Sequence, residues 1–259
     1  MAAVGLSAEV VPWGDGVDWG AYEGVVVRGT WDYIEARDEF LDWAASVAAV
    51  TRLANPFEVL RWNTDKSYLR DLEAAGIPIV PTTWGSQGPF PEGEFVVKPA
   101  VSAGARNSAR HTSAASGAAH AAAIEADGGV AMVQPFLASV ESEGETGTYV
   151  FGGQVSHAIR KMGILDPGAS PADVPSMSSV DRVSSVPVDP ALAEFALRVL
   201  AASEFAEPVL YARVDTVPGL DGRPLVIELE LTEPYLFLAD QPAAAAPFAA
   251  TTAAWLAAP

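Results

Sequence analysis

Four charged residues stand at strand spacing within an otherwise apolar segment, residues 211–234. Arg213 and Asp215 are two positions apart, and so are Glu228 and Glu230. Side chains two positions apart in a β-strand point to the same face, so two paired strands could bring three carboxylates and a guanidinium together. Mg²⁺ binds through carboxylate oxygens and keeps substrate phosphate as a further ligand. The pattern fits a metal site, and equally a solvent-exposed hairpin face or charges that protect an edge strand.

A hairpin is needed to position these residues. The sequence predicts strands at Tyr211–Val217 and Leu225–Leu231, with a turn rich in proline and glycine between them. The residues that alternate with the charged positions are apolar and suit a core; they are Ala212, Val214, Ile227, Leu229 and Leu231.

Lysine is used at only three positions. Of the 15 Lys and Arg residues, 12 are arginine, and the lysines are Lys66, Lys98 and Lys161. An ammonium is a compact point charge that suits phosphate. Thr64 is the predicted cap of a helix that carries Lys66 in its first turn, where a cation opposes the helix dipole. Lys98 is followed by the small-residue loop Val101–Ser108, whose backbone N–H groups could wrap phosphate. Solvated surface lysines placed by chance are the alternative.

The first part of the chain has βα organisation. Gly24–Arg28 predicts a buried strand and Ile34–Val50 an amphipathic helix, which indicates a small α/β domain with a parallel sheet. Ligands gather at the carboxyl ends of such strands. The candidate ligand residues there are Arg28, Thr30 and Trp31. Pairing of Arg28 with an acid such as Asp32 is the alternative.

Further strands follow in the second half. Val130–Leu137 predicts a strand that runs into a hinge at Gln134, and Thr146–Phe151 and Gln154–Lys161 predict a hairpin with Glu145 at its entrance. His157 on the second of these strands is more often a hydrogen-bonded packing residue than a catalyst. A proline-punctuated loop is predicted at 166–179.

Composition narrows the function classes. The chain has 259 residues, 50% of them hydrophobic, so a sizeable core is available. The net charge of −18 argues against a nucleic-acid surface. The absence of cysteine excludes disulfides and thiolate metal sites. No signal peptide or membrane-spanning run is evident, so the expectation is a soluble cytoplasmic protein. The Gly/Pro-rich stretch Ser86–Gly93 is the predicted domain boundary.

Taken in order, these parts resemble the ATP-grasp superfamily, which includes glutathione synthetase and D-alanine–D-alanine ligase. The order is a lysine at a helix start, a strand lysine before a small-residue loop, a Gln-Pro-Phe-Leu hinge, a glutamate before a hairpin, and the Arg-x-Asp and Glu-x-Glu strands. The resemblance implies a mixed α/β (α+β) ATP-grasp fold behind a small N-terminal α/β domain. The implied domains are 1–85 and 86–259, the latter divided into a lid subdomain at about 93–136 and a C-terminal subdomain at about 137–259.

The resemblance also implies roles for individual residues. The chain would bind ATP with Mg²⁺, and Mn²⁺ is an alternative metal. The implied nucleotide-binding residues are Lys66, Lys98, Ser102, Gly104, Arg106, Gln134, Phe136, Leu137, Glu145 and Lys161. The implied metal ligands are Asp215, Glu228 and Glu230, and the family often has asparagine where Glu230 stands. Arg213 would be the catalytic residue that steadies the transferring phosphoryl group, whose oxygens carry charge in the transition state.

The amino-acid sequences of several segments are most similar to those of the cycloserine-synthetase-type branch, whose enzyme cyclises O-ureido-serine with ATP. These segments are RWNTDKSYLRDLEAAGIPIVPT, EFVVKP, VQPFLASVESEGET, SHAIRK and RVD…VIELELTEP. Compared with the family, the chain is N-terminally shortened: a stub precedes Glu9–Trp13 where a strand and a complete helix are usual. The loop VSAGARNS also differs from the one common in the branch.

The function expected from the resemblance is an ATP-dependent carboxylate–amine ligase, amide-forming or cyclising, that works through an acyl phosphate. Its partners would be small-molecule carboxylates and amines, with no nucleic acid and no membrane, and a homodimer is left open. Candidate substrate contacts are Arg28, Thr30, Trp31 and His157. The alternative is a non-catalytic or regulatory ATP-binding module with a truncated substrate domain.

Overall fold

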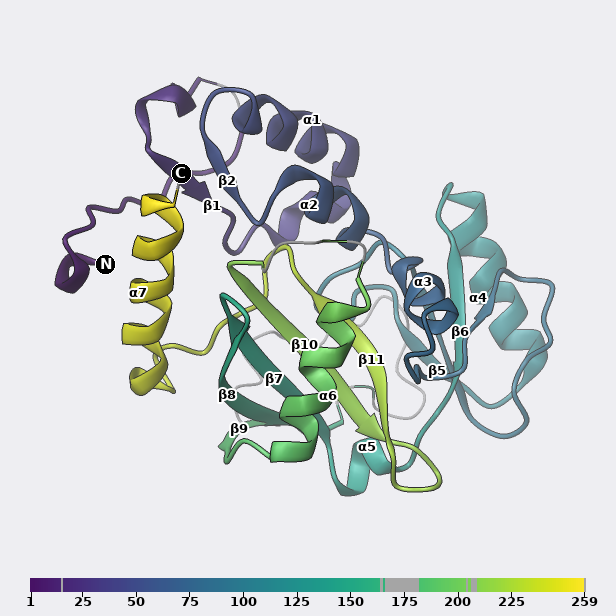
Figure 1. Ribbon diagram of the computed structural model, residues 1–259. Helices are drawn as coiled ribbons and strands as arrows, with labels where there is room; N and C mark the ends of the chain where they lie inside the picture. Colours follow the sequence, from purple (N-terminus) through teal and green to yellow (C-terminus); the bar gives the residue numbers. More distant parts are fainter. Residues whose placement is uncertain (15, 164, 166–181, 204, 206–208, 259) are drawn as a thin grey trace.

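The computed structural model describes residues 1–14, 16–163, 165, 182–203, 205 and 209–258. The loop predicted at 166–179 lies outside them. The structure contains two antiparallel sheets and a small N-terminal α/β unit. The largest sheet lies in the middle, and the other two parts lie beside it (Figure 1). The mixed α/β class expected from the sequence is confirmed.

The largest sheet is antiparallel, with the strand order β11-β10-β7-β8-β9. Its strands are β7 (Glu145–Phe151), β8 (Gln154–Lys161), β9 (Val183–Val186), β10 (Tyr211–Pro218) and β11 (Pro224–Glu230). Helix α6 (Pro190–Ala201) packs on the face where β10 and β11 place their apolar residues, and Phe195, Val214 and Leu229 share one buried cluster. The opposite face of β10 and β11 is therefore left for their charged residues.

A second antiparallel sheet has the order β3-β6-β4-β5. Its strands are β3 (Thr83–Trp84), β4 (Phe95–Pro99), β5 (Ala109–His111) and β6 (Ala131–Pro135), and helix α4 (Ala114–Ala126) packs on it. A Cβ at Gly117 in α4 would lie 2.4 Å from the ring of Phe95, so glycine lets this helix approach β4 closely. β3 lies before the predicted boundary at 85/86 yet pairs with β6. The short helix α5 (Ser139–Ser142) leads to β7.

The N-terminal unit contains a two-stranded parallel sheet, β1 (Gly24–Val26) and β2 (Arg52–Ala54), as the βα pattern predicts. The helix predicted at 34–50 is present as the 3₁₀ segment η3 (Trp31–Glu35) followed by α1 (Arg37–Ala48). Two further 3₁₀ segments are η1 (Ala2–Val4) and η2 (Trp19–Ala21). Trp13, Phe40 and Trp43 pack ring against ring at 5.5–6.0 Å and supply much of this unit's core.

The prediction that Thr64 begins a helix is wrong. Helix α2 (Phe57–Asn63) ends at Thr64, and α3 (Tyr68–Ala74) begins after it. Lys66 lies in the connection between them, where its backbone N–H donates to the Ala100 carbonyl at 2.9 Å. Lys66 therefore does not lie in the first turn of a helix, and its ammonium does not oppose a helix dipole there. The hydrogen bond to Ala100 places Lys66 beside the loop that follows β4.

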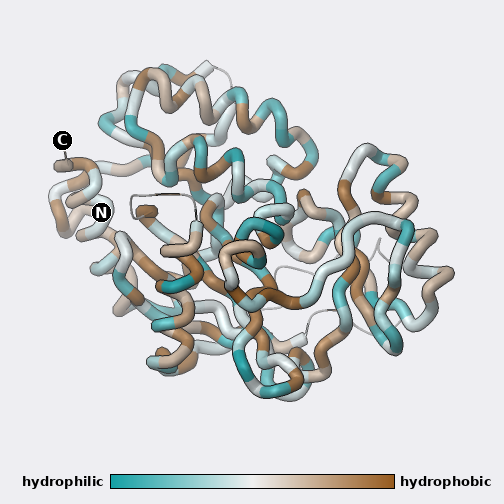
Figure 2. Tube along the Cα trace, turned by 45° about the vertical axis from the view of Figure 1, so that its right-hand side comes forward, coloured by the Kyte–Doolittle hydropathy of each residue, from teal (hydrophilic) through white to brown (hydrophobic). Residues whose placement is uncertain are grey.

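The C-terminal helix α7 (Pro242–Ala257) returns to the N-terminal unit, and the two chain ends lie on the same side of the molecule (Figure 1). Arg52 of β2 donates to the carbonyls of Leu256 and Ala258 at the end of this helix. Figure 2 shows hydrophobic segments within the central strands and hydrophilic residues interspersed along the helices around them. No helix in the described part of the chain is long and apolar enough to cross a membrane.

Candidate active site

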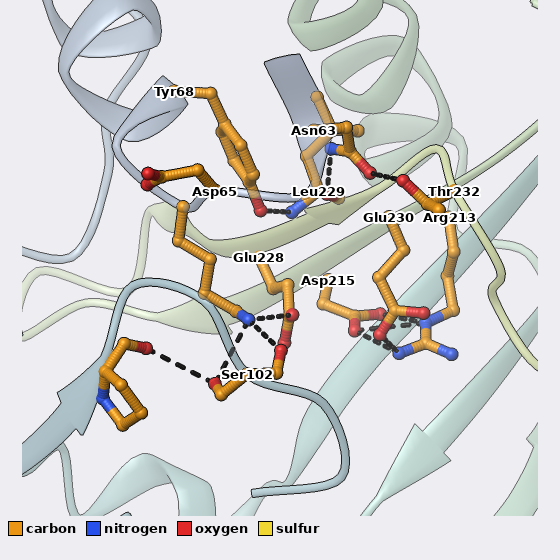
Figure 3. A network of polar contacts seen from close by, with 12 residues as sticks. Asn63, Asp65, Tyr68, Ser102, Arg213, Asp215, Glu228, Leu229, Glu230 and Thr232 are labelled. Carbon is orange, nitrogen blue, oxygen red and sulfur yellow. Dashed lines mark hydrogen bonds and ion pairs between the residues drawn. The ribbon is translucent and has the colours of Figure 1, made fainter. Parts of the chain in front are cut away.

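The charged residues of β10 and β11 lie on one face because of the pairing register. Arg213 is opposite Glu230, and Asp215 is opposite Glu228. Oxygen atoms of Asp215, Glu228 and Glu230 lie within 4.8 Å of one another (Figure 3). Ligands on opposite sides of a Mg²⁺ ion stand about 4.2 Å apart, given Mg–O distances of about 2.1 Å. Three converging hard oxygen donors on paired strands therefore fit a divalent cation such as Mg²⁺.

Arg213 and Lys161 balance the charge of this face. The Arg213 guanidinium contacts Asp215 through Nε and Nη2 at 2.7–3.0 Å and also contacts Glu230. The Lys161 ammonium donates to Asp215 at 2.8 Å and contacts Glu145. Asp215 is fully buried, so each of these contacts is made away from bulk water. Two cations thus hold Asp215 in one orientation.

The environment separates the pKa values of the carboxyls. Burial alone would raise the pKa of Asp215, but Arg213 and Lys161 outweigh it and hold that pKa well below the usual value. At Glu230 burial prevails over Arg213 and raises the pKa to about 7. At Glu228 burial is outweighed by Lys66 and Lys98, and the pKa is lowered. Near neutral pH the site therefore keeps anionic oxygens at Asp215 and Glu228, as a metal ligand set requires.

Gly147 in β7 gives the Arg213–Asp215 pair its space. A Cβ at this position would lie 2.8 Å from Asp215 Oδ1 and 3.1 Å from Arg213 Cδ. Both side chains are buried and ion-paired, so they cannot move away without losing contacts. We expect Gly147→Ala to lower the free energy of unfolding by about 1–3 kcal/mol, in line with overpacking of a filled core, and to reduce turnover.

Urea denaturation and ADP release measure these two effects of Gly147→Ala. The matched control is Gly20→Ala, because a Cβ at Gly20 meets nothing nearer than 3.4 Å. If Gly147→Ala is as stable and as active as Gly20→Ala, the steric account of Gly147 is wrong.

The two other lysines border the same space but differ in their partners. Lys66 is buried and contacts Glu228 at 3.3 Å as well as the backbone carbonyl and hydroxyl of Ser102. The Lys98 ammonium has no hydrogen bond or ion pair within the described part of the chain, and burial lowers its pKa. A cation without a partner in a cavity wall is suited to an anionic ligand.

A cavity of about 460 Å³ lies between the two antiparallel sheets. Its walls carry most of the residues that the sequence singled out. These are Trp31, Lys66, Lys98, Ser102, Gly104, Gln134, Phe136, Leu137, Glu145, Lys161, Arg213, Glu228 and Glu230. Asp215 lies behind this wall, in contact with Lys161 and Arg213. Residues from Trp31 to Glu230 along the chain thus converge on a single space.

Comparison with known proteins agrees with this convergence. Cycloserine biosynthesis protein DcsG of Streptomyces lavendulae is 38% identical to this chain in an alignment of 252 residues that covers 91% of this chain and 84% of that protein. The chain belongs to the D-cycloserine synthetase family. A crystal structure of D-cycloserine synthetase DcsG matches it with a TM-score of 0.90 and 36% identity, covering 98% of this chain and 91% of that one. The family model for the N-terminal domain of D-cycloserine synthetase matches residues 1–55.

More distant structures share the fold of the D-cycloserine synthetase family. The ATP-grasp ligase PsnB, complexed with a precursor variant, Mg and ADP, matches with a TM-score of 0.58 and 16% identity over 89% of this chain and 78% of that one. D-alanine–D-alanine ligase from Bacillus anthracis, complexed with ATP, matches with a TM-score of 0.56 and 13% identity over 91% and 78%. The fold is the ATP-grasp fold, as expected, and the chain is an enzyme, an ATP-grasp ligase.

Besides Asp215, four of the predicted site residues do not line the cavity of this D-cycloserine synthetase homologue. Arg106 is exposed and pairs with Glu35 at 2.8 Å. His157 stacks on the Tyr149 ring at 4.1 Å and contacts the Leu236 carbonyl, which is the packing alternative that the sequence favoured. Arg28 donates to the Pro234 carbonyl at 2.6 Å, and pairing with Asp32 is not observed.

Thr30 is the fourth of these residues, and its buried hydroxyl has no hydrogen-bond partner among the described residues. Arg28 and Thr30 belong to the connection between β1 and η3, just before Trp31, which lines the cavity. They therefore lie near the cavity without forming its wall.

Sequence reasoning missed three residues at the site, and two of them, Asn63 and Tyr68, have no signal in the sequence. Asn63 at the end of α2 donates to the Leu229 carbonyl at 2.7 Å and accepts from the Leu231 N–H at 2.6 Å, which joins the helix to β11 (Figure 3). Tyr68 accepts from the Leu229 N–H at 2.9 Å. Glu233 lines the cavity beyond β11. An acid shortly after the end of the charged strand β11 is a signal that could have pointed to Glu233, whereas the Asn63 contact joins positions 166 residues apart.

Proposed function

We propose that this chain joins a carboxylate to an amine, in an amide-forming or cyclising reaction, through an acyl phosphate made from ATP. The observation that carries the proposal is that one cavity and its wall bring together a fitting metal ligand set, a buried arginine, and a lysine that has no partner in the described part of the chain. The names of the D-cycloserine synthetase relatives make cycloserine formation the candidate reaction, and the resemblance of the motifs implies O-ureido-serine as its substrate.

The nucleotide would lie along the wall formed by the β3-β6-β4-β5 sheet. Gln134, with the backbone of Phe136 and Leu137, would hold adenine, and Glu145 would hold the ribose hydroxyls. Gln134 donates its amide to Thr82 at 2.9 Å, which fixes its side-chain orientation and leaves its carbonyl oxygen free to accept.

The phosphates would lie where the lysines converge. Lys98 and Lys66 would bind the α- and β-phosphates, and Lys161 would be a further contact. The loop around Ser102 and Gly104 would close over the triphosphate. Gly104 has a φ of 61°, and the loop is tied to Lys66 through Ser102, so a phosphate bound by Lys66 would also be near the loop's backbone. Arg106 would join only by leaving Glu35.

Asp215, Glu228 and Glu230 would hold Mg²⁺, or alternatively Mn²⁺, which supplies charge neutralisation at the phosphoryl oxygens. Arg213 would face the γ-phosphoryl group. A substrate carboxylate oxygen attacks the γ-phosphorus, the bond to the β-phosphate oxygen breaks, and ADP leaves. The amine nitrogen then attacks the acyl carbon, inorganic phosphate leaves, and the nitrogen loses one proton. With O-ureido-serine this nitrogen carries a carbamoyl group, and water must also remove that group as carbon dioxide and ammonia to give cycloserine. Positioning and electrostatic stabilisation carry such a reaction without a protein nucleophile.

The test is ADP and phosphate release by the full chain with Mg·ATP and O-ureido-serine, together with mass spectrometry of the product. Other amino acids and hydroxamates form the comparison panel. We expect release that depends on the carboxylate substrate and a product of the mass of cycloserine. Tight Mg·ATP binding without turnover on any member of the panel would instead favour the non-catalytic module.

A further inference from the structure

Glu233 is an unpaired acid in the cavity wall. Its side chain is only 8% exposed, yet its carboxylate has no hydrogen bond or ion pair within the described part of the chain. The other buried acids of the site each have a cation within reach: Glu145 has Lys161, Glu228 has Lys66 and Glu230 has Arg213. Glu233 is thus the one acid of this set that the described residues leave without a partner.

The backbone around Glu233 is held by side chains from three other elements. The Tyr211 hydroxyl donates to the Thr232 carbonyl at 2.8 Å, Arg28 donates to the Pro234 carbonyl at 2.6 Å, and the Tyr149 hydroxyl donates to the Tyr235 carbonyl at 2.8 Å. These contacts stand on both sides of Glu233. The carboxylate therefore cannot reach solvent by a shift of its segment without breaking them.

The surroundings of Glu233 suit a cation. Trp31 and Tyr235 line the same cavity with ring centroids 6.1 Å apart, and buried Tyr33 lines it too. Burial is the largest cause that raises the pKa of Glu233 to about 8, followed by the charge of Glu230. A buried carboxylate without a partner is costly. An ammonium ion would satisfy the carboxylate, and aromatic ring faces also attract it.

We infer that Glu233 anchors a protonated amine of the substrate, so that the ligase takes an amino acid whose ammonium lies at Glu233 while its carboxylate is activated beside Arg213. The inference rests on the proposed function for the identity of the activated carboxylate. Arg28 is a positioning residue in this arrangement, because it holds Pro234 next to Glu233 and does not line the cavity. Two charged side chains of the site have no partner among the described residues, and each then binds a ligand group of the opposite charge. Lys98 binds phosphate, and Glu233 binds ammonium.

The test uses two probes that differ only in the ammonium: O-ureido-serine and its des-amino analogue, 3-(ureidooxy)propanoate. Calorimetry measures their binding to the full chain with Mg²⁺ and the non-hydrolysable ATP analogue AMPPNP. We expect the wild-type protein to bind O-ureido-serine roughly 100-fold more tightly than the analogue, the size expected for a desolvated charge pair. Glu233→Gln should abolish this preference and leave the binding of AMPPNP unchanged.

The control variant is Glu39→Gln, which removes an exposed acid of α1 with the same change in net charge. Glu233→Asp keeps the charge on a shorter arm and should retain part of the preference, and thermal unfolding verifies that each variant is folded. Equal binding of the two probes by the wild-type protein, or no binding of either, would overturn the inference, as would a preference that survives in Glu233→Gln. The binding measurement does not depend on turnover. If Glu233→Gln loses the preference but the wild-type protein releases no ADP, the proposed reaction is contradicted and the ammonium anchor stands.

Discussion

Asp215→Asn should lower kcat on the order of 10³-fold, the size expected when one charged element of transition-state stabilisation is lost. The carboxylate has two functions: it is a member of the metal ligand set, and it orients Arg213 and Lys161 at 2.7–3.0 Å. An amide keeps the shape but loses the charge. The variant also leaves two buried cations with less compensating charge, so we expect a loss of roughly 3 kcal/mol in the free energy of unfolding.

ADP release across a range of Mg²⁺ concentrations, together with urea denaturation, measures both effects. Glu228→Gln is the companion variant: it removes a metal ligand that is ion-paired with Lys66 at 3.3 Å, so activity should fall with a smaller loss of stability than in Asp215→Asn. Asp221→Asn is the matched control, since Asp221 lies on the exposed turn between the same two strands and pairs with exposed Arg223. An Asp215→Asn variant with near wild-type kcat would remove the basis for the metal site.

Lys98→Met should weaken the binding of Mg·AMPPNP about 100-fold, or roughly 3 kcal/mol, the size of a charge-assisted contact that is lost. Methionine keeps the apolar stem of the side chain. Because the ammonium has no partner in the described part of the chain, its removal costs the free protein no ion pair. The variant should therefore be at least as stable as the wild-type protein in the absence of nucleotide.

Lys66→Met is the matched comparison, because it removes a lysine that is bound to Glu228 and Ser102. It should lose both nucleotide affinity and stability, whereas Lys98→Met should lose affinity alone. Calorimetry and thermal unfolding on the same samples separate the two patterns. Unchanged nucleotide affinity in Lys98→Met would show that this lysine is not a phosphate ligand.

The β10–β11 hairpin was predictable because its signals are local. Alternation of charged and apolar residues over a few positions defines two strands and their faces, and the observed bounds differ from the predicted ones by one residue at three of the four ends and not at all at Tyr211. The same holds for β8, whose bounds are the predicted ones, Gln154–Lys161. Thr64 was misread because a threonine before a polar turn resembles a helix cap, while the preceding segment, α2, is itself helical.

By itself, the sequence determined the two strands of the charged hairpin, the three lysines and the order of motifs that identifies the ATP-grasp fold, because each of these is encoded in neighbouring residues. Whether the two charged faces coincide was decided only by the pairing of Arg213 with Glu230 and of Asp215 with Glu228. Tertiary structure alone also paired Lys66 with Glu228, left Lys98 and Glu233 without partners among the described residues, and joined Asn63 to β11. These outcomes depend on contacts between residues far apart along the chain, and on which charges the folded protein neutralises, and local patterns carry no information on either.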